Sequence, residues 1–319
     1  MGLQATVQDA GRSGMLASGI TQGGAVDHFA LRRGNRLVGN SPDCAGLEIV
    51  LAGATFAVAG AVDLAVTGAP VPIEINGQPI PMDTCVHAGA GDQICLGKSR
   101  SANYSYLSIA GGVDTPPVFG SRSTVVREAL GGLHGGVLAP GDTLPLQATD
   151  GGKWAKKSPR AVTAKNPKVG QSLNSEALRL RFIPCIHYDR AAQHSRGALE
   201  RQEFRVSGAA NRMAIPLLGT PLQTGIEQLW SEATLYGSIQ VPPSGNPLVL
   251  LNDRQTMGGY PQLGTIIPPD CVRLAQAHAG RRVRLEPISP ERADEILWYC
   301  KHYEDTLLEA LQKQRAIIE

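Results

Sequence analysis

The sequence predicts a mainly β protein, built as antiparallel sandwiches or barrels in two halves and followed by one C-terminal helix. Glycine (37 residues) and proline (22) are abundant and aromatic residues make up only 5%, a composition typical of many turns between short strands. The strand-like segments follow one another closely without alternating helices, which disfavours a parallel sheet. With 319 residues, 42% of them hydrophobic, the chain is long enough to bury two domain cores.

Charge and cysteine usage exclude several classes of function. The net charge is +2 (30 Lys and Arg minus 28 Asp and Glu), which is too small to indicate a nucleic-acid or membrane partner. The six cysteines form no CxxC pair and do not cluster with histidines, so we expect no metal site. The segment 1–7 lacks the apolar core of a signal peptide, and no apolar run approaches a membrane span. We therefore expect a cytoplasmic protein.

The N-terminal region is predicted to contain a strand, a glycine turn and a helix. Residues 6–14 predict a short strand entering a turn that carries Asp9 and Arg12. A helix is predicted over 26–39, since apolar residues recur on one face, Asp27 lies in the first turn and Gly39 ends the last turn. Three arginines are expected on its solvated face, with an anion site as the alternative: Arg32, Arg33 and Arg36.

The rest of the first half is predicted to be strands separated by turns. The segments with the strand pattern are 48–51, 55–58, 63–67, 73–75 and 102–110. Asn76-Gly77 predicts a tight hairpin. A glycine turn entering an alternating strand recurs at 88–96, 138–146 and 279–285. This echo suggests two similar halves but is too short to prove a duplication.

Residues 151–170 contain six basic residues and no acidic one, which indicates a linker. The predicted organisation is a β domain over 1–150, a linker or exposed excursion over 151–175, a second β domain over 176–288 and an amphipathic helix over 289–319. The second domain is expected to contain strands at 177–183 and 204–206, and a helix or loop at 191–203. The final helix is expected to begin at a Ser289 cap and to bury one stripe: Ile296, Leu297, Cys300, Tyr303, Leu307, Leu308 and Leu311.

The stretch 239–261 carries the strongest indication of a site. A short strand at 239–241 is followed by a proline-rich turn and by an unbroken apolar strand at 248–251. Five polar residues follow at once (252–256), then a glycine-rich segment (257–261) whose backbone can turn sharply or approach a ligand. A rigid strand that ends in polar side chains is a common support for a site. The alternative is a polar turn that caps its own backbone.

Three polar clusters beside glycines could carry chemistry: Asp9 with Arg12 and Asp27, Asn211 with Arg212, and the run 253–256. Arginine offers a fork for a carboxylate or carboxyphosphate, and aspartate can act as a base or orient another group. For each cluster the alternative is that the residues only tie loops together. The segment 97–99 lacks the spacing of a phosphate loop, and dinucleotide, nucleophile-elbow and zinc-helix motifs are missing from the sequence.

The clusters and their flanking segments resemble a known family, the KipA-type proteins, also described as allophanate-hydrolase-subunit-2-like or biotin-dependent carboxyltransferase proteins. The C-subunit of 5-oxoprolinase is a member. The matching segments are TVQDAGRSG (6–14), GGAVDHFALRRGNRLVGN (23–40), LEIVLAG (47–53), AGGVDTPPVFGSRSTVVREALGGLHG (110–135), NRM (211–213) and IQVPPSGNPLVLLNDRQTMGGYP (239–261). They extend over most of the chain in the order of the family.

The resemblance implies two cyclophilin-like β-barrel domains and action beside a KipI-like subunit. Family members with a third subunit open 5-oxoproline to glutamate with ATP. Fused relatives move a carboxyl group from carboxybiotin to urea, and another relative is a non-catalytic antagonist of a kinase inhibitor. This sequence departs from the family pattern at Asn211 and Ala214, where the family has aspartate and glycine, and at Met257, where it has threonine.

The expected function is therefore an ATP-dependent 5-oxoprolinase-type hydrolase subunit, active in complex with a KipI-like and possibly a third subunit on a small amide. The alternatives are a carboxyltransferase component that acts on urea or a similar amide, and a non-catalytic partner of a KipI-like protein. ATP is expected to be used by the complex, since this chain has no phosphate loop. Only under the carboxyltransferase alternative is biotin expected, on a separate carrier.

The resemblance, together with the polar clusters, suggests two expected catalytic residues, Asp253 and Arg254. Arg254 and Arg212 are expected to hold oxygens of the substrate or of a phosphorylated intermediate, with Asp253 orienting them. The expected substrate-binding residues are Arg12, Asp27, Asn211, Arg212, Gln240, Gln255, Thr256, Gly258, Gly259 and Tyr260.

Overall fold

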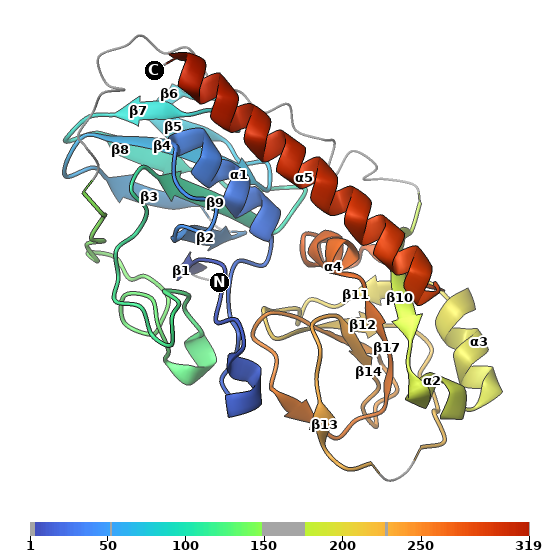
Figure 1. Ribbon diagram of the computed structural model, residues 1–319. Coiled ribbons are helices and arrows are strands. Elements are labelled where there is room, and N and C mark those ends of the chain that lie inside the picture. The colour runs from blue at the N-terminus through green and yellow to red at the C-terminus, as the bar shows by residue number, and fades with distance from the viewer. Residues whose placement is uncertain (1–3, 52, 149–175, 227–228, 319) are drawn as a thin grey trace. The chain divides into compact units, whose positions relative to one another are not determined.

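The computed structural model describes residues 4–51, 53–148, 176–226 and 229–318, and the chain groups into two compact units (Figure 1). The first unit comprises Met1–Ser13, Gly23–Val169 and Tyr303–Glu319, and the second comprises Gly14–Gln22 and Gly170–His302. The linker expected at 151–175 lies outside the described residues.

The first unit contains two antiparallel sheets. The five-stranded sheet has the order β1 (Gln4–Gln8), β2 (Gly46–Val50), β9 (Tyr104–Ile109), β4 (Val62–Gly68) and β7 (Val86–Ala88). The four-stranded sheet has the order β3 (Ala54–Ala57), β8 (Gln93–Leu96), β5 (Ile73–Ile75) and β6 (Gln78–Pro79). One apolar cluster joins both sheets and includes the buried Leu47, Leu64 and Ile94. Burial of such side chains supplies most of the stabilisation of a core.

One turn of the first unit confirms its prediction from the sequence, and one predicted strand is wrong. Asn76 (φ 51°) and Gly77 (φ 76°) form the predicted hairpin, in which Ile75 pairs with Gln78. The strand predicted within 138–146 is wrong, because this segment makes only an isolated bridge between Leu146 and Val113. Pro145, next to Leu146, has no backbone N–H to donate, so it cannot extend this bridge into a longer ladder.

The helix predicted at 26–39 is confirmed as α1 (His28–Val38). The Asp27 side chain caps it by accepting from Ala30 N at 3.0 Å, and Gly39 ends it with φ 81°. The expectation of a solvated arginine face is wrong for Arg33, which is 3% exposed and pairs with the buried Asp83 at 2.6 Å. The partner carboxylate comes from a distant loop, so the local helical pattern could not reveal the pair.

The second unit contains a closed seven-stranded barrel with the order β10 (Leu178–Pro184), β17 (Gln262–Ile266), β14 (Ser238–Gln240), β15 (Leu248–Leu250), β12 (Ala214–Leu218), β11 (Phe204–Val206) and β18 (Arg282–Pro287). The neighbours are antiparallel except β10 and β18, which are parallel and close the barrel. A separate two-stranded ribbon pairs β13 (Glu232–Ala233) with β16 (Met257–Gly258). A mainly β fold with few helices is thus confirmed.

Short helices accompany the strands of the second unit: α2 (Ile186–Arg190), α3 (Gln193–Arg201) and α4 (Pro268–Ala275). Single 3₁₀ turns lie at Met15–Ser18 in this unit and at Val126–Glu128 in the first. Helix α4 was not predicted from the sequence, although two prolines at its start and Asp270 in its first turn are typical of a helix N-terminus.

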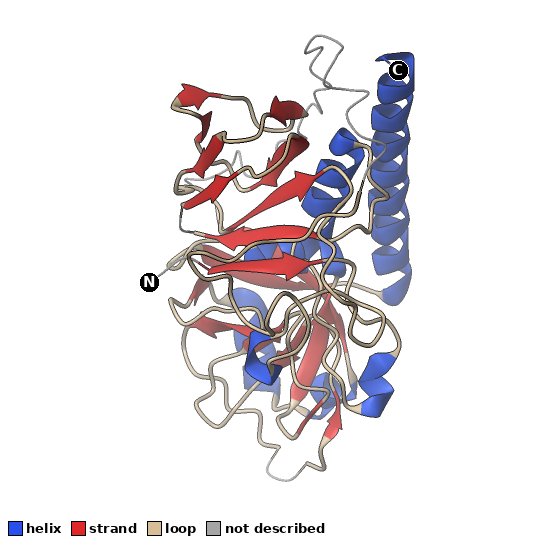
Figure 2. Ribbon diagram, turned by 90° about the vertical axis from the view of Figure 1, so that its left-hand side faces the viewer, coloured by secondary structure: helices blue, strands red, loops and turns tan. Residues whose placement is uncertain are grey.

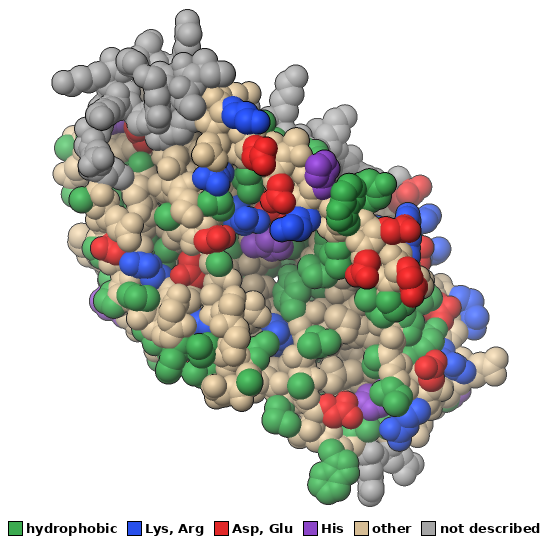
Figure 3. Space-filling model, viewed as in Figure 1, with side chains coloured by type: hydrophobic (Ala, Val, Ile, Leu, Met, Phe, Trp, Pro, Cys, Tyr) green, Lys and Arg blue, Asp and Glu red, His purple; other side chains and the backbone are tan. Residues whose placement is uncertain are grey.

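The C-terminal helix α5 (Pro290–Ile318) runs without interruption (Figure 2) and begins at the predicted cap, where Ser289 Oγ accepts from Arg292 N at 3.2 Å. The predicted stripe is wrong at Cys300 and Tyr303, which are exposed. The helix is packed near its ends, through Ile296 in one apolar cluster and Leu311 in another. Hydrophobic side chains between these ends lie on the surface (Figure 3).

Within the described part of the chain, no helix has both the length and the apolarity needed to cross a membrane.

Candidate functional site

The candidate site of the second unit is built on two neighbouring barrel strands, β12 and β15. Ala214 pairs with Leu250 in the antiparallel ladder. The ladder continues into the adjoining loops, because Leu251 N donates to Met213 O at 2.9 Å and Asp253 N donates to Arg212 O at 3.0 Å. The backbone on either side of the polar residues is therefore fixed by the barrel, as a preorganised site requires.

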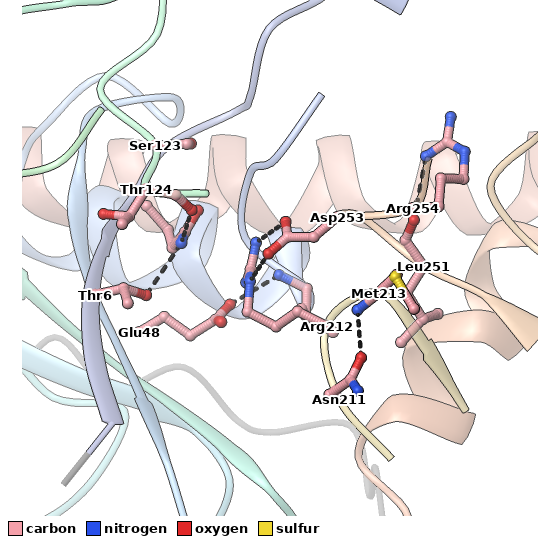
Figure 4. Close-up of polar contacts among 12 residues, drawn as sticks. Thr6, Glu48, Ser123, Thr124, Asn211, Arg212, Met213, Leu251, Asp253 and Arg254 are labelled. Atoms are coloured by element: carbon pink, nitrogen blue, oxygen red, sulfur yellow. Dashed lines mark hydrogen bonds and ion pairs between the residues drawn. The ribbon is translucent and has the colours of Figure 1, made fainter. Parts of the chain in front are cut away.

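Arg212 and Asp253 meet as a two-point ion pair (Figure 4). Nε and Nη2 of Arg212 donate to Oδ2 and Oδ1 of Asp253, each at 2.9 Å, and the two side chains are 13% and 10% exposed. Such two-point, charge-assisted hydrogen bonds pair the two charges and also fix the orientation of the side chains. The Asn211 side chain accepts from Met213 N at 2.8 Å, which closes the turn before β12. The carboxylate of Asp253 thus positions Arg212.

Arg254 extends from the same loop away from the Arg212–Asp253 pair (Figure 4). Its side chain is 3% exposed, and Nη1 donates to Leu251 O at 3.2 Å. Within the described residues its Nε has no hydrogen-bond partner, and its guanidinium forms no ion pair. Burial lowers the pKa of Arg254, with Tyr236 and Cys271 acting in the opposite direction. A buried cation without a counter-charge is costly and would be stabilised by an anionic ligand.

The remaining predicted residues of this loop lie beside the β13–β16 ribbon. Thr234 ties the loop down, since its N–H donates to Thr256 O at 3.0 Å and its hydroxyl donates to Gln255 O. Gly258 belongs to the ribbon, and a Cβ there would lie 2.6 Å from Nε2 of the buried Gln240. Gly259 and Tyr260 are exposed. The structure therefore brings Gln240, Gln255 and Gly258 together.

The predicted site residues of the first unit mainly hold its own loops. Arg12 is 1% exposed and donates to Val118 O at 3.1 Å and Ser123 O at 2.6 Å. Asp9 accepts from the Ser121 hydroxyl at 2.6 Å, and Asp27 caps α1. These bonds tie the N-terminal turn to the segment 118–123, which is the role given above as the alternative for this cluster.

A buried carboxylate in the first unit was not among the predicted site residues. Glu48 in β2 is fully buried and accepts from Tyr106 Oη at 2.7 Å and from Val26 N at 2.8 Å. Burial and the Glu48 charge raise the pKa of Tyr106 well above its ordinary value. A glutamate within the apolar run LEIVL was the signal that could have found it.

The first unit also contains a cavity of about 210 Å³, lined in part by Asp9, Cys44, Arg122 and Gln147. Burial raises the pKa of the Cys44 thiol, which disfavours a reactive thiolate. Among the described residues no group of three or more His, Cys, Asp or Glu side chains is arranged to hold a metal ion.

One family model and two related proteins match most of this chain. The model of the family "Carboxyltransferase domain, subdomain A and B" matches residues 18–287. The C-subunit of the Escherichia coli K12 5-oxoprolinase is 36% identical over 293 residues, which cover 92% of this chain and 91% of the relative. The C-subunit of the Haemophilus influenzae 5-oxoprolinase is 30% identical, with 92% and 91% covered.

A solved structure extends the comparison to the fold. The urea carboxylase of Kluyveromyces lactis superimposes with a TM-score of 0.85 at 23% identity, covering 97% of this chain and 28% of the larger protein. At this identity the similarity concerns the fold alone.

Proposed function

The chain belongs to the family of carboxyltransferase domains with subdomains A and B, and from this premise we propose that it is a subunit of an ATP-dependent 5-oxoprolinase-type hydrolase. Its substrate is then 5-oxoproline, which is opened to glutamate. The observation that carries the proposal is the 36% identity with the C-subunit of a 5-oxoprolinase over 92% of this chain and 91% of the relative.

The second unit supplies side chains suited to an anionic amide. We propose that Arg254 binds the carboxylate of 5-oxoproline, because its buried guanidinium has no ion pair among the described residues. Arg212 then contacts oxygens of the substrate or of a phosphorylated intermediate, oriented by Asp253 through their two-point pair. Asp253 is thereby an orienting group and Arg254 a binding group.

Arg12 and Asp27 are proposed to act indirectly, by holding the loops of the first unit through their bonds to Ser123 and Ala30. Asn211 has the same kind of role in the second unit, since its side chain closes the turn that carries Arg212. A charge is not required for this role, which accounts for an amide at a position where the family has aspartate.

ATP is assigned to another subunit of the complex. The segment Gly97-Lys98-Ser99 follows β8 and leads to strand β9 instead of a helix N-terminus, so it does not fit a phosphate loop. A KipI-like subunit and a third subunit are the proposed partners, and one of them carries the nucleotide. Gln255 and Thr256 of this chain remain available to contact the shared substrate.

The test is co-purification of the native complex followed by an assay of ADP and glutamate formation. The proposal expects ATP hydrolysis that depends on 5-oxoproline and that requires this chain together with its partners. Equal amounts of ADP and glutamate would show coupling. A complex that hydrolyses ATP at the same rate with and without 5-oxoproline contradicts the proposal.

The family match favours a second candidate, a carboxyltransferase that acts on urea or a similar amide. Under this candidate the co-purified complex contains a biotinylated carrier, and its activity is lost when avidin is added. A complex that lacks biotin and turns over 5-oxoproline excludes the second candidate. Stable binding to a KipI-like protein without turnover of either substrate would instead support the non-catalytic regulator.

A further inference from the structure

The side-chain amide of Gln240 is fully buried and has no hydrogen-bond partner. Its exposure is 0%, and neither Oε1 nor Nε2 meets a donor or acceptor among the described residues. Among the buried side chains that the structure describes, Gln240 is the one carboxamide that lacks partners at both ends. Buried amides are almost always satisfied, because an unsatisfied group loses its bonds to water without replacement. An unsatisfied amide in a candidate site therefore points to a ligand.

The position of Gln240 is fixed by the barrel. It is the last residue of β14 and pairs with Leu248 of β15 on one side and with Gln262 of β17 on the other. The neighbouring Gln262 shows the ordinary pattern, since its Nε2 donates to Ala233 O at 3.2 Å. Strand pairing thus fixes the backbone of Gln240, whereas its side-chain amide makes no hydrogen bond among the described residues.

Gly258 makes the space beside the amide. A Cβ at this position would lie 2.6 Å from Gln240 Nε2 and 3.4 Å from Gln255 Nε2, so a larger residue would displace the amide. Gly258 lies close to the Gln240 amide and belongs to a ribbon of two residue pairs. Met257 in this ribbon is 56% exposed. The ribbon is held by two residue pairs and by the bonds from Thr234 to Gln255 O and Thr256 O, so we infer that a ligand reaches the amide by a local displacement at Gly258.

We propose that Gln240 recognises the ring amide of the substrate by two hydrogen bonds. A lactam ring holds its N–H and C=O on the same side, and a carboxamide presents an acceptor and a donor with the matching spacing. Oε1 of Gln240 accepts from the ring N–H, and Nε2 donates to the ring carbonyl. This inference rests on the proposed function and adds a specificity-determining residue for a cyclic cis amide.

The test compares 5-oxoproline with its lactone analogue, 5-oxotetrahydrofuran-2-carboxylate, in which a ring oxygen replaces the N–H. Both are measured with the co-purified complex, 5-oxoproline as substrate and the lactone as competitor. The wild type should bind the lactam about tenfold or more tightly than the lactone, because the lactone leaves Oε1 unpaired. In Gln240→Leu the ratio of lactam affinity to lactone affinity should fall to about one.

Two further variants make the test specific. Gly258→Ala should lower the ratio as well, since the new Cβ displaces Gln240 Nε2, the far end of a flexible side chain. Gln202→Leu is the matched control, because the Gln202 amide is satisfied by the backbone of Thr220 and should leave the ratio unchanged.

The outcomes separate the inference from the proposed function. A ratio that is lost in Gln240→Leu and kept in Gln202→Leu supports the inference. An unchanged ratio in Gln240→Leu, in a complex that still turns over 5-oxoproline, overturns the inference and leaves the proposed function standing. A wild-type complex that neither binds nor turns over 5-oxoproline overturns both.

Discussion

Asp253 holds Arg212 through both of its carboxylate oxygens, across the ends of two paired barrel strands. The pair lies where the ladder of β12 and β15 ends, and the backbones of the two residues are themselves hydrogen-bonded. The next residue, Arg254, extends away from this pair into a buried position. The loop thus presents one arginine whose orientation is fixed and a second whose charge is uncompensated within the described residues.

Removing the orienting carboxylate should destabilise the second unit. Asp253→Ala leaves the largely buried Arg212 without its fork, and we expect the free energy of unfolding to fall by about 2–4 kcal/mol. Chemical denaturation measures this loss. Glu203→Ala is the matched control, because it breaks partly exposed pairs with Arg282 and Arg284 and should cost about 1 kcal/mol or less. Equal losses in the two variants would contradict a specific role for the Arg212–Asp253 pair.

Gln240→Leu should not destabilise the protein. Leucine is similar in size, and it removes a buried amide that makes no hydrogen bond, so the free energy of unfolding should stay constant or rise by about 1 kcal/mol. Gln202→Leu should lower it by about 1 kcal/mol, since two bonds with Thr220 are lost. A large loss of stability in Gln240→Leu would mean that its amide has a structural partner.

Asp270 should make the protein sensitive to acid. Burial raises the pKa of this carboxyl, but bonds from Arg181 and the Arg273 charge outweigh burial and lower it from the ordinary 3.8. The folded state therefore binds fewer protons than the unfolded state, so this contribution to stability is present above pH 3.8 and is lost as the pH falls through the lowered value.

Asp270→Asn tests this dependence. The variant should be less stable than the wild type at pH 7, because the two-point contact with Arg181 at 2.8 Å is weakened. Its stability should also change less between about pH 5 and pH 2, the range over which this carboxylate is protonated. Parallel pH profiles for the two proteins in thermal unfolding would refute the assignment.

The six cysteines should differ strongly in reactivity. Cys271 is fully buried, and burial raises the pKa of its thiol, so it should react with an alkylating reagent only after unfolding. Cys300 is exposed on α5 and should react in the native protein. Mass spectrometry after brief alkylation, with Cys300→Ser as control, measures the difference. Native labelling of Cys271 would contradict the packing of α4.

Local patterns in the sequence were sufficient for several elements. Asp27 and Gly39 mark the limits of α1, Asn76-Gly77 marks a hairpin, and Ser289 marks the start of α5. Each of these features depends on residues within a few positions of one another, which is the range over which capping and turn rules act.

Features that depend on distant residues could not be predicted in this way. The barrel closes through parallel pairing of Leu178 with Val283, and Arg33 is buried because Asp83 meets it from another part of the chain. The sequence indicated a site at 252–256 but not its internal geometry. Asn252 and Asp253 form a turn in which Arg254 N donates to Leu251 O, so the alternation of side chains along a strand could not predict that Asp253 and Arg254 separate.

We propose that this chain provides the binding site for an anionic lactam, with Arg254 as its counter-charge. The decisive experiment measures kcat/KM for 5-oxoproline in the co-purified complex that carries Arg254→Gln, with Arg284→Gln on the exposed surface as control. We expect kcat/KM to fall by about 100-fold or more in Arg254→Gln, since a buried charge-assisted contact is lost, and to change little in the control. An unchanged kcat/KM in Arg254→Gln would show that Arg254 does not bind the substrate.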